Sequence, residues 1–185
     1  LQLAQGSFAA FGQGIANTPD GKLFVVSGGD VYFPVPGQTV SSALSTTTNF
    51  NELPVIPAVL GGTIHAIENG TRGAVHHSVS PYTAWTTSGT FAAAGVQSHI
   101  SYGGKLWAQS GTVVHTSANG TSWGTLTNHP PLAGRLIGFQ NAVYCYPTSI
   151  ATNSALYRTV DGGASAWGTL TANYSGSGIT NAWYA

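Results

Sequence analysis

Hydrophobic and polar residues alternate along this chain in short runs, each bounded by a turn dipeptide. Val113–His115 and Leu156–Arg158 are two such runs. Alternation with a period of two places one side of an extended strand toward a core and the other toward solvent. The turn pairs are Asp20-Gly21, Gly28-Gly29, Asn69-Gly70, Gly103-Gly104, Asn119-Gly120 and Asp161-Gly162. Such pairs join antiparallel strands into hairpins, and no stretch shows a sustained 3.6-residue period, so the pattern predicts an all-β chain.

The hairpins recur at a regular interval. Copies of one segment begin near Lys22, Thr63, Lys105 and Ala142, at intervals of 41, 42 and 37 residues, and three copies end in Trp85, Trp123 and Trp167. About 40 residues per copy is typical of one four-stranded blade of a β-propeller. We therefore expect one β-propeller-like domain over residues 1–185. Its four antiparallel blades should lie at about residues 12–50, 60–95, 96–130 and 134–172.

The two ends of the chain predict partial blades. Gln5–Ile15 is similar to Ser88–Ser98, which ends one blade and leads to the next, and Gly178–Ala185 matches a first strand. The chain has no methionine, even at position 1. We expect it to be part of something longer or of an oligomer, with further protein at both ends.

Two turns share a spaced motif of a hydroxyl, an amide or carboxylate, a glycine and a tryptophan. Its residues are Ser117, Asn119, Gly120 and Trp123 in one copy and Thr159, Asp161, Gly163 and Trp167 in the other. Asn and Asp side chains bond the backbone of their own turn, and glycine adopts positive φ without strain. These residues, and Trp85 in a third copy, are therefore expected to be structural.

The motif resembles the Asp-box of bacterial neuraminidase-like (BNR) propellers. Its shortened form is similar to boxes of phage tail-fibre and other virion appendage proteins. The resemblance implies that each box joins the third and fourth strands of a blade and that its Trp packs between blades. It also implies a virion or extracellular location.

Composition narrows the choice of partners. Five Lys plus Arg balance five Asp plus Glu, and the basic residues are scattered. Nucleic-acid binding needs clustered cations, so we expect no nucleic-acid partner. No apolar run is long enough to span a membrane, and we expect no membrane partner. Cys145, the single cysteine, is expected to be a small buried hydrophobe.

Catalytic chemistry has little support, and we expect no catalytic residues. A sialidase needs three convergent arginines, whereas Arg72, Arg135 and Arg158 occupy three different blade positions. Other glycosidases need two carboxyl groups across the scissile bond. The carboxylates are Asp20, Asp30, Glu52, Glu68 and Asp161. Asp20 and Asp161 lie in turn pairs, where bonding the backbone is role enough, and Glu52 and Glu68 are expected to be loop residues with no visible partner.

A possible ligand-facing surface comes from aligning the blades on their tryptophans. His77, His115 and Tyr157 then share one third-strand position, and Trp107 is a further candidate ligand-facing aromatic. Equivalent positions on neighbouring blades lie too far apart to share a zinc ion, so we expect no metal and no cofactor. Flat rings and hydroxyl groups instead suit a carbohydrate or a protein surface.

Three functions remain open. The first is a non-enzymatic structural or adhesion module of a phage tail fibre or other virion appendage, binding host-surface glycan or a neighbouring virion protein. The second is a glycan-cleaving enzyme on a propeller scaffold. The third is a secreted cellular propeller, for which the sequons at Asn69, Asn119 and Asn173 are compatible with glycosylation.

Overall fold

The computed structural model describes residues 14–17, 23–27, 30–32, 55–68, 73–80, 82, 84–90, 95–147 and 155–170. The regular elements in these ranges are all β-strands, which confirms the predicted all-β fold. The strands are β1 (Gly14–Asn17), β2 (Leu23–Ser27), β3 (Asp30–Tyr32), β4 (Val55–Leu60), β5 (Thr63–Glu68), β6 (Ala74–Val79), β7 (Thr86–Thr90), β8 (Val96–Tyr102), β9 (Lys105–Ser110), β10 (Val113–Ser117), β11 (Gly124–Thr125), β12 (Gly134–Phe139), β13 (Ala142–Pro147), β14 (Leu156–Thr159) and β15 (Gly168–Leu170).

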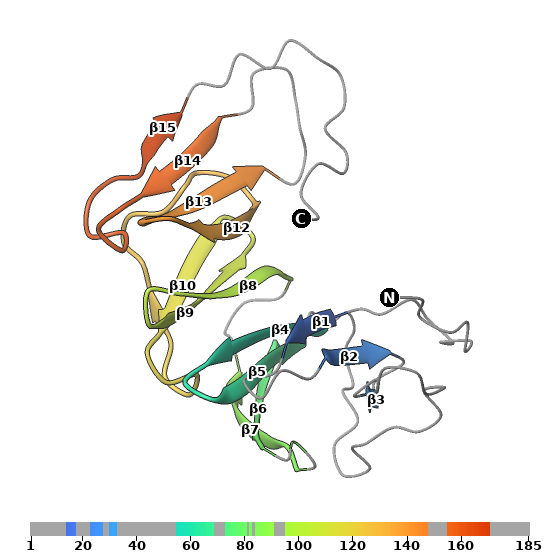
Figure 1. Ribbon diagram of the computed structural model, residues 1–185. Coiled ribbons are helices and arrows are strands. Elements are labelled where there is room, and N and C mark those ends of the chain that lie inside the picture. Colours follow the sequence, from blue (N-terminus) through green and yellow to red (C-terminus); the bar gives the residue numbers. More distant parts are fainter. Residues whose placement is uncertain are drawn as a thin grey trace.

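The strands form four antiparallel sheets in which spatial order follows chain order. We name them sheet I (β1–β3), sheet II (β4–β7), sheet III (β8–β11) and sheet IV (β12–β15). The first strands of successive sheets contact one another, β1 with β4, β4 with β8, and β8 with β12. Figure 1 shows the sheets following one another around an arc. Sheet II begins at Val55, which is earlier than the repeat boundary expected near residue 60.

The partial blades expected at the two ends, Gln5–Ile15 and Gly178–Ala185, fall outside the described residues except for Gly14 and Ile15, which begin strand β1 of sheet I. In sheet I the described strands are the first three of the repeat.

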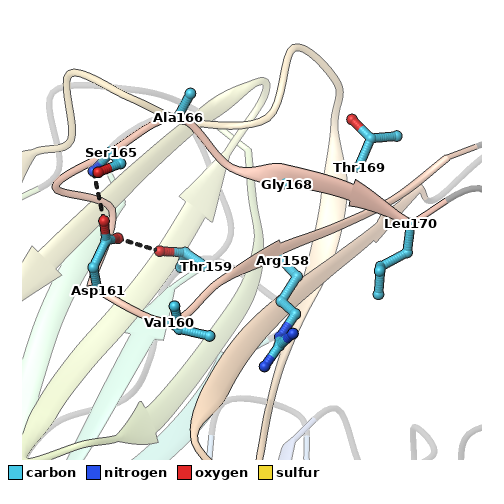
Figure 2. Close-up of a pocket in the computed structure, with 9 residues that line it drawn as sticks. All are labelled: Arg158, Thr159, Val160, Asp161, Ser165, Ala166, Gly168, Thr169 and Leu170. Atoms are coloured by element: carbon cyan, nitrogen blue, oxygen red, sulfur yellow. Dashed lines mark hydrogen bonds between the residues drawn. The ribbon is translucent and has the colours of Figure 1, made fainter.

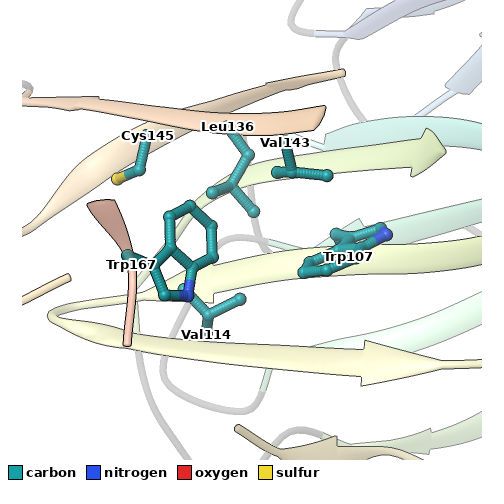
Figure 3. Packing of buried hydrophobic residues seen from close by; sticks show 6 residues of the cluster. All are labelled: Trp107, Val114, Leu136, Val143, Cys145 and Trp167. Atoms are coloured by element: carbon teal, nitrogen blue, oxygen red, sulfur yellow. The ribbon is translucent and has the colours of Figure 1, made fainter. Parts of the chain in front are cut away.

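Sheets III and IV meet in a hydrophobic cluster that we call the III–IV seam. Its buried members are Trp107, Val114, Leu136, Val143, Cys145 and Trp167. Figure 3 shows the Trp167 ring among side chains from both sheets. Its ring meets that of Trp107 edge to face, with centroids 6.5 Å apart, an arrangement that aromatic pairs prefer. Each sheet thus buries one face against its neighbour.

Polar groups complete this seam. Gln109 is fully buried, and its Nε2 donates to the carbonyl of Leu132 at 2.8 Å. The Cys145 thiol donates to Gln109 Oε1 at 3.1 Å, and burial raises the pKa of Cys145 to about 12. A thiol in this state is a poor nucleophile, because the reactive species is the thiolate. Cys145 therefore serves as a small packing residue, as its alternation with aromatics predicts.

Sheets II and III meet in a smaller cluster, the II–III seam. It contains Ile67, Val75, Val96 and Ala108, with Trp123 packed against them. Trp123 immediately precedes β11, and Trp85 and Trp167 immediately precede β7 and β15. The three tryptophans thus hold the same place relative to the fourth strand of their sheets.

We expect Trp167→Ala to lower the free energy of unfolding by about 3–5 kcal/mol, because it leaves a cavity in the III–IV seam. Urea denaturation followed by far-ultraviolet circular dichroism measures this loss. Val160→Ala is the control, since Val160 is 64% exposed and its truncation should cost no more than about 0.5 kcal/mol. Equal losses in the two variants would contradict the role of Trp167 in the seam.

Candidate functional site

The turn from Ser117 to Trp123 is held together by its own side chains. Ser117 Oγ accepts from the amides of Asn119 and Gly120, at 3.3 and 2.8 Å. Asn119 Oδ1 accepts from the next two amides, those of Thr121 and Ser122, at 2.9 and 3.0 Å. Trp123 Nε1 donates to the Gly120 carbonyl at 3.2 Å. The Ser117 hydroxyl, the Asn119 carbonyl oxygen and the Trp123 indole therefore all bond within the turn.

The turn from Thr159 to Trp167 is also closed by its hydroxyl residue, with a carboxylate in place of the amide. Thr159 Oγ1 donates to Asp161 Oδ1 at 2.8 Å and accepts from the Gly163 amide at 2.9 Å. The Ser165 amide donates to Asp161 Oδ2 at 2.9 Å. Hydrogen bonds from Ser165 and Thr159 lower the pKa of Asp161 to about 2. An acid held in its ionised form in this way is a poor proton donor at neutral pH.

Both turns also hold one sheet against the previous one. Gly120 has φ +75°, and a Cβ there would lie 2.1 Å from the His65 ring of sheet II. In sheet IV, Trp167 Nε1 donates to the Asn128 carbonyl at 3.0 Å, and Asn128 Nδ2 donates to the Ala164 carbonyl at 3.0 Å. The motif thus joins neighbouring sheets as well as closing its own turn.

Sheet II closes the corresponding turn differently. Ser78 Oγ donates to the Ala84 carbonyl at 2.6 Å, and the Tyr82 amide donates to the Val79 carbonyl at 2.7 Å. Tyr82 is buried and has φ +64°, which is unusual for a residue with a side chain. A buried tyrosine thus stands where the other two turns have glycine.

The strand register shows which histidine is equivalent to His115. Ala108 pairs with His115 and Cys145 pairs with Tyr157, and in sheet II the matching pair is Ala66 with His76. The row of equivalent positions is therefore His76, His115 and Tyr157. The alignment that placed His77 in this row is wrong by one residue, which moves a side chain to the opposite face of a strand.

The cause of this error is the length of the turns. The hydroxyl residue precedes its tryptophan by six residues in sheet III, by seven in sheet II and by eight in sheet IV. The one extra residue in the sheet II turn, compared with sheet III, accounts for the whole error. Counting back from Trp85 therefore ends on His77, which faces sheet III.

His76 belongs to a buried polar group that the sequence analysis did not identify. Its Nε2 lies 2.8 Å from Glu68 Oε1, and its Nδ1 lies 3.2 Å from Thr87 Oγ1. A carboxylate, an imidazole and a hydroxyl in this order also occur in sites that activate a nucleophile. Glu68 was expected to be a loop residue without a partner, but it ends strand β5 and is buried against His76. The only signal in the sequence was its place at the end of the apolar run TIHAIE.

Comparison of sheet II with sheet III indicates that this group is structural. His115 Nδ1 lies 3.2 Å from Thr125 Oγ1, in the same register as His76 and Thr87. Ser110 occupies the position of Glu68 in that sheet. Since the imidazole–hydroxyl bond recurs without the carboxylate, it is a property of the blade.

His77 lies beside a second buried histidine. It pairs with His65 across the strands, with ring centroids 6.2 Å apart, and its Nδ1 lies 2.9 Å from Ser88 Oγ. His65 Nδ1 is buried without a hydrogen-bond partner against Gly120. Burial, with a smaller effect of His77, lowers the pKa of His65 to about 4. Burial also lowers the pKa of His115, with a further contribution from His129.

Two other candidate residues differ in exposure. Trp107 is only 3% exposed and donates through Nε1 to the Tyr102 carbonyl at 3.1 Å. It belongs to the III–IV seam, so the expectation of a ligand-facing ring at this position is wrong. Tyr157 is half-buried and packs against the same seam. The row of His76, His115 and Tyr157 is therefore turned mostly into the protein.

A pocket of about 290 Å³ lies on the β14–β15 hairpin of sheet IV. Its lining residues are Arg158, Thr159, Val160, Asp161, Ser165, Ala166, Gly168, Thr169 and Leu170. Figure 2 shows Arg158 and Leu170 directed to one side of the hairpin and Thr169 to the other. The Arg158 guanidinium lies 5.9 Å from the centre of the Tyr144 ring. The pocket combines a cation, hydroxyls and exposed aliphatic surface.

No group of three His, Cys, Asp or Glu residues in the described part of the chain is arranged to hold a metal ion. No helix within the described ranges is long and apolar enough to cross a membrane.

Comparison with known proteins supports the propeller fold. No protein-family model and no curated protein matches the chain. A catalytically inactive variant of virginiamycin B lyase from Staphylococcus aureus, solved with quinupristin, matches with a TM-score of 0.66 at 11% identity. A GH74 enzyme from Niastella koreensis matches with a TM-score of 0.64 at 19% sequence identity. YCF48 from Cyanidioschyzon merolae matches with a TM-score of 0.62 at 12% sequence identity. All are β-propeller proteins.

These similarities establish the fold alone. The matches cover 89%, 84% and 88% of this chain, in the order given above. They cover 56% of the lyase, 24% of the GH74 enzyme and 56% of YCF48. The chain thus spans about half the length of two of these propellers and a quarter of the third. Some of the similar structures are enzymes and others are binding proteins.

We expect Gly120→Ala to destabilise the protein more than Gly162→Ala. Both glycines have φ +75°, but a Cβ at 120 would overlap the His65 ring, whereas position 162 has open space. Backbone strain is common to both variants. The difference between their unfolding free energies therefore measures the overlap with His65, which we expect to cost about 1–3 kcal/mol. Chemical denaturation of the two variants measures it. A difference below the experimental error would contradict the packing of His65 on Gly120.

We expect stability to fall as the pH decreases from about 6.5 to about 4. The folded pKa of His65 is about 4, so the unfolded chain takes up the proton first and is favoured by acid. At pH 4 the loss of unfolding free energy due to His65 approaches about 3 kcal/mol, since one pKa unit corresponds to about 1.4 kcal/mol. Urea unfolding at several pH values should show a shallower dependence for His65→Phe. Parallel curves for the two proteins would contradict this assignment.

Proposed function

We propose that this chain is a non-enzymatic adhesion module of a virion appendage such as a phage tail fibre, and that it binds a host-surface glycan. The proposal places the protein on the virion or outside the cell. It also interprets the Ser117 and Thr159 turns as shortened Asp-boxes with a structural role. A neutral, hydroxyl-rich composition with 5% charged residues suits neutral saccharides better than nucleic acid.

The observation that carries the proposal is that the described carboxylates make structural contacts. The described acidic side chains are those of Glu68 and Asp161. Glu68 is buried beside His76, and Asp161 holds its own turn through hydrogen bonds from Thr159 and Ser165. Glycoside hydrolysis by the usual mechanisms needs one carboxyl group as acid and a second as base or nucleophile. Both described carboxylates are instead tied to the architecture, which supports binding over cleavage.

The pocket on sheet IV is our candidate for the glycan site. Its 290 Å³ is close to the lower limit for small-molecule sites and suits one sugar ring. The Arg158 guanidinium can donate to sugar oxygens on the same side of the hairpin as Leu170. Leu170 is 41% exposed and offers an apolar surface to the C–H face of a ring. A neutral hexose matches this combination.

We expect Arg158→Ala to weaken binding on a glycan array about tenfold, which corresponds to one charged hydrogen bond of about 1.5 kcal/mol. Arg135→Ala is the matched control, because Arg135 is also exposed in sheet IV but does not line the pocket. Equal losses in the two variants would point to unspecific charge attraction. Release of reducing ends from a bound glycan would instead support the glycan-cleaving alternative.

A further inference from the structure

Two histidines of sheet II face the II–III seam. His65 and His77 pair across β5 and β6, two residues along from the pair Ile67–Val75, so all four side chains lie on one face of the sheet. Ile67 and Val75 are members of the seam. The His65 and His77 rings are therefore directed toward sheet III, where His65 packs on Gly120.

Two histidines of sheet III face the same seam from the other side. His99 and His115 both pair with Ala108, which is a member of the II–III seam. The centre of the His99 ring lies 5.9 Å from that of Trp123, which packs against the same seam. His65, His99 and His115 are all buried. Four of the six histidines of the chain thus face one junction between sheets.

The described charges around these histidines do not offset their protonation. Among the described strand residues, no Asp, Glu, Lys or Arg lies on either of the two faces. Glu68 lies on the opposite face of sheet II. Burial, and then the neighbouring His77, lowers the pKa of His65, and burial, and then His129, lowers the pKa of His115. Protonation therefore places like charges in a buried seam, which is unfavourable.

The III–IV seam differs in composition. Its cluster of described residues contains no histidine and no carboxylate. Its buried polar pair, Gln109 and Cys145, keeps its charge between pH 7 and pH 5, because the pKa of Cys145 is about 12. Histidine is the side chain that ordinarily titrates in this range. Mild acid therefore acts on the II–III seam and leaves the III–IV seam unchanged.

We propose that the II–III seam is a pH-sensitive interface, at which sheet II separates from sheet III in mild acid while the III–IV seam stays closed. Opening returns water to the imidazoles and restores their ordinary pKa. The closed form is therefore favoured above about pH 6.5 and becomes less favoured as the pH falls toward 4. Each proton taken up on opening favours the open form by about tenfold per pH unit. This behaviour does not depend on what the sheet IV pocket binds.

A chain with one thiol in each seam can test the proposal. Val96→Cys introduces a thiol in the II–III seam, and Cys145 already provides one in the III–IV seam. Both positions are fully buried. Each thiol is labelled with 4,4′-dithiodipyridine at pH 7 and pH 5, and mass spectrometry after digestion gives the two rates. Dividing each rate by that of the denatured chain at the same pH gives the fraction of time for which each seam is open.

We expect the open fraction at the introduced thiol to rise about 100-fold from pH 7 to pH 5, because at least two histidines take up protons on opening. At pH 5 it should exceed the open fraction at Cys145 by at least ~10-fold, since protonation opens only the II–III seam. Adding His65→Phe should reduce the rise to about tenfold, because one fewer proton is taken up. His76→Gln is the matched control, since His76 lies on the opposite face of sheet II, and should leave the rise unchanged.

Three results would overturn the proposal. The first is an introduced thiol whose open fraction does not rise in acid. The second is an equal open fraction at the two thiols at pH 5, which would indicate global unfolding. The third is an undiminished rise in the His65→Phe chain. Circular dichroism at pH 7 verifies that each variant folds, and Val75→Cys and His115→Gln replace Val96→Cys and His65→Phe if either of these does not.

Discussion

The architecture depends on the packing of one sheet's tryptophan turn against the previous sheet. An isolated four-stranded sheet has two faces, and this chain has few charged side chains with which to solvate both. Trp123 packs into the II–III seam and Trp167 into the III–IV seam. The glycine in each turn lets the backbone approach the previous sheet closely, at His65 in one seam and at Leu126 in the other. Each seam joins only neighbouring sheets. The free energy of unfolding is therefore approximately the sum of contributions from the individual sheets and from the seams between them.

Much of this arrangement follows from the sequence because its determinants are local. Turn dipeptides mark the hairpins, alternation marks the strands, and the spacing of the tryptophans gives the size of one blade. The hydrogen bonds that Ser117, Asn119, Thr159 and Asp161 make involve residues no more than four positions apart. Such bonds can be anticipated from residue type alone, as can the absence of helix from the described ranges.

The features that the sequence did not reveal depend on register and on contacts between sheets. Because of a one-residue difference in turn length, the alignment assigned His77 to the row that belongs to His76, on the opposite face of the strand. Trp107 looked like an exposed aromatic because the sheet that buries it lies about 30 residues further along the chain. The contact between Glu68 and His76 arises only when two strands pair. Periodicity describes one strand at a time and contains none of this information.

The three tryptophan turns differ in length while keeping their two ends fixed. The hydroxyl residue belongs to the third strand and the tryptophan to the start of the fourth, with five, six or seven residues between them. The scaffold has therefore already accommodated insertions at this position without losing a seam. This makes the outward-facing part of the turn suitable for loop grafting. Foreign peptides inserted there would be displayed side by side along the outer edge of the sheets.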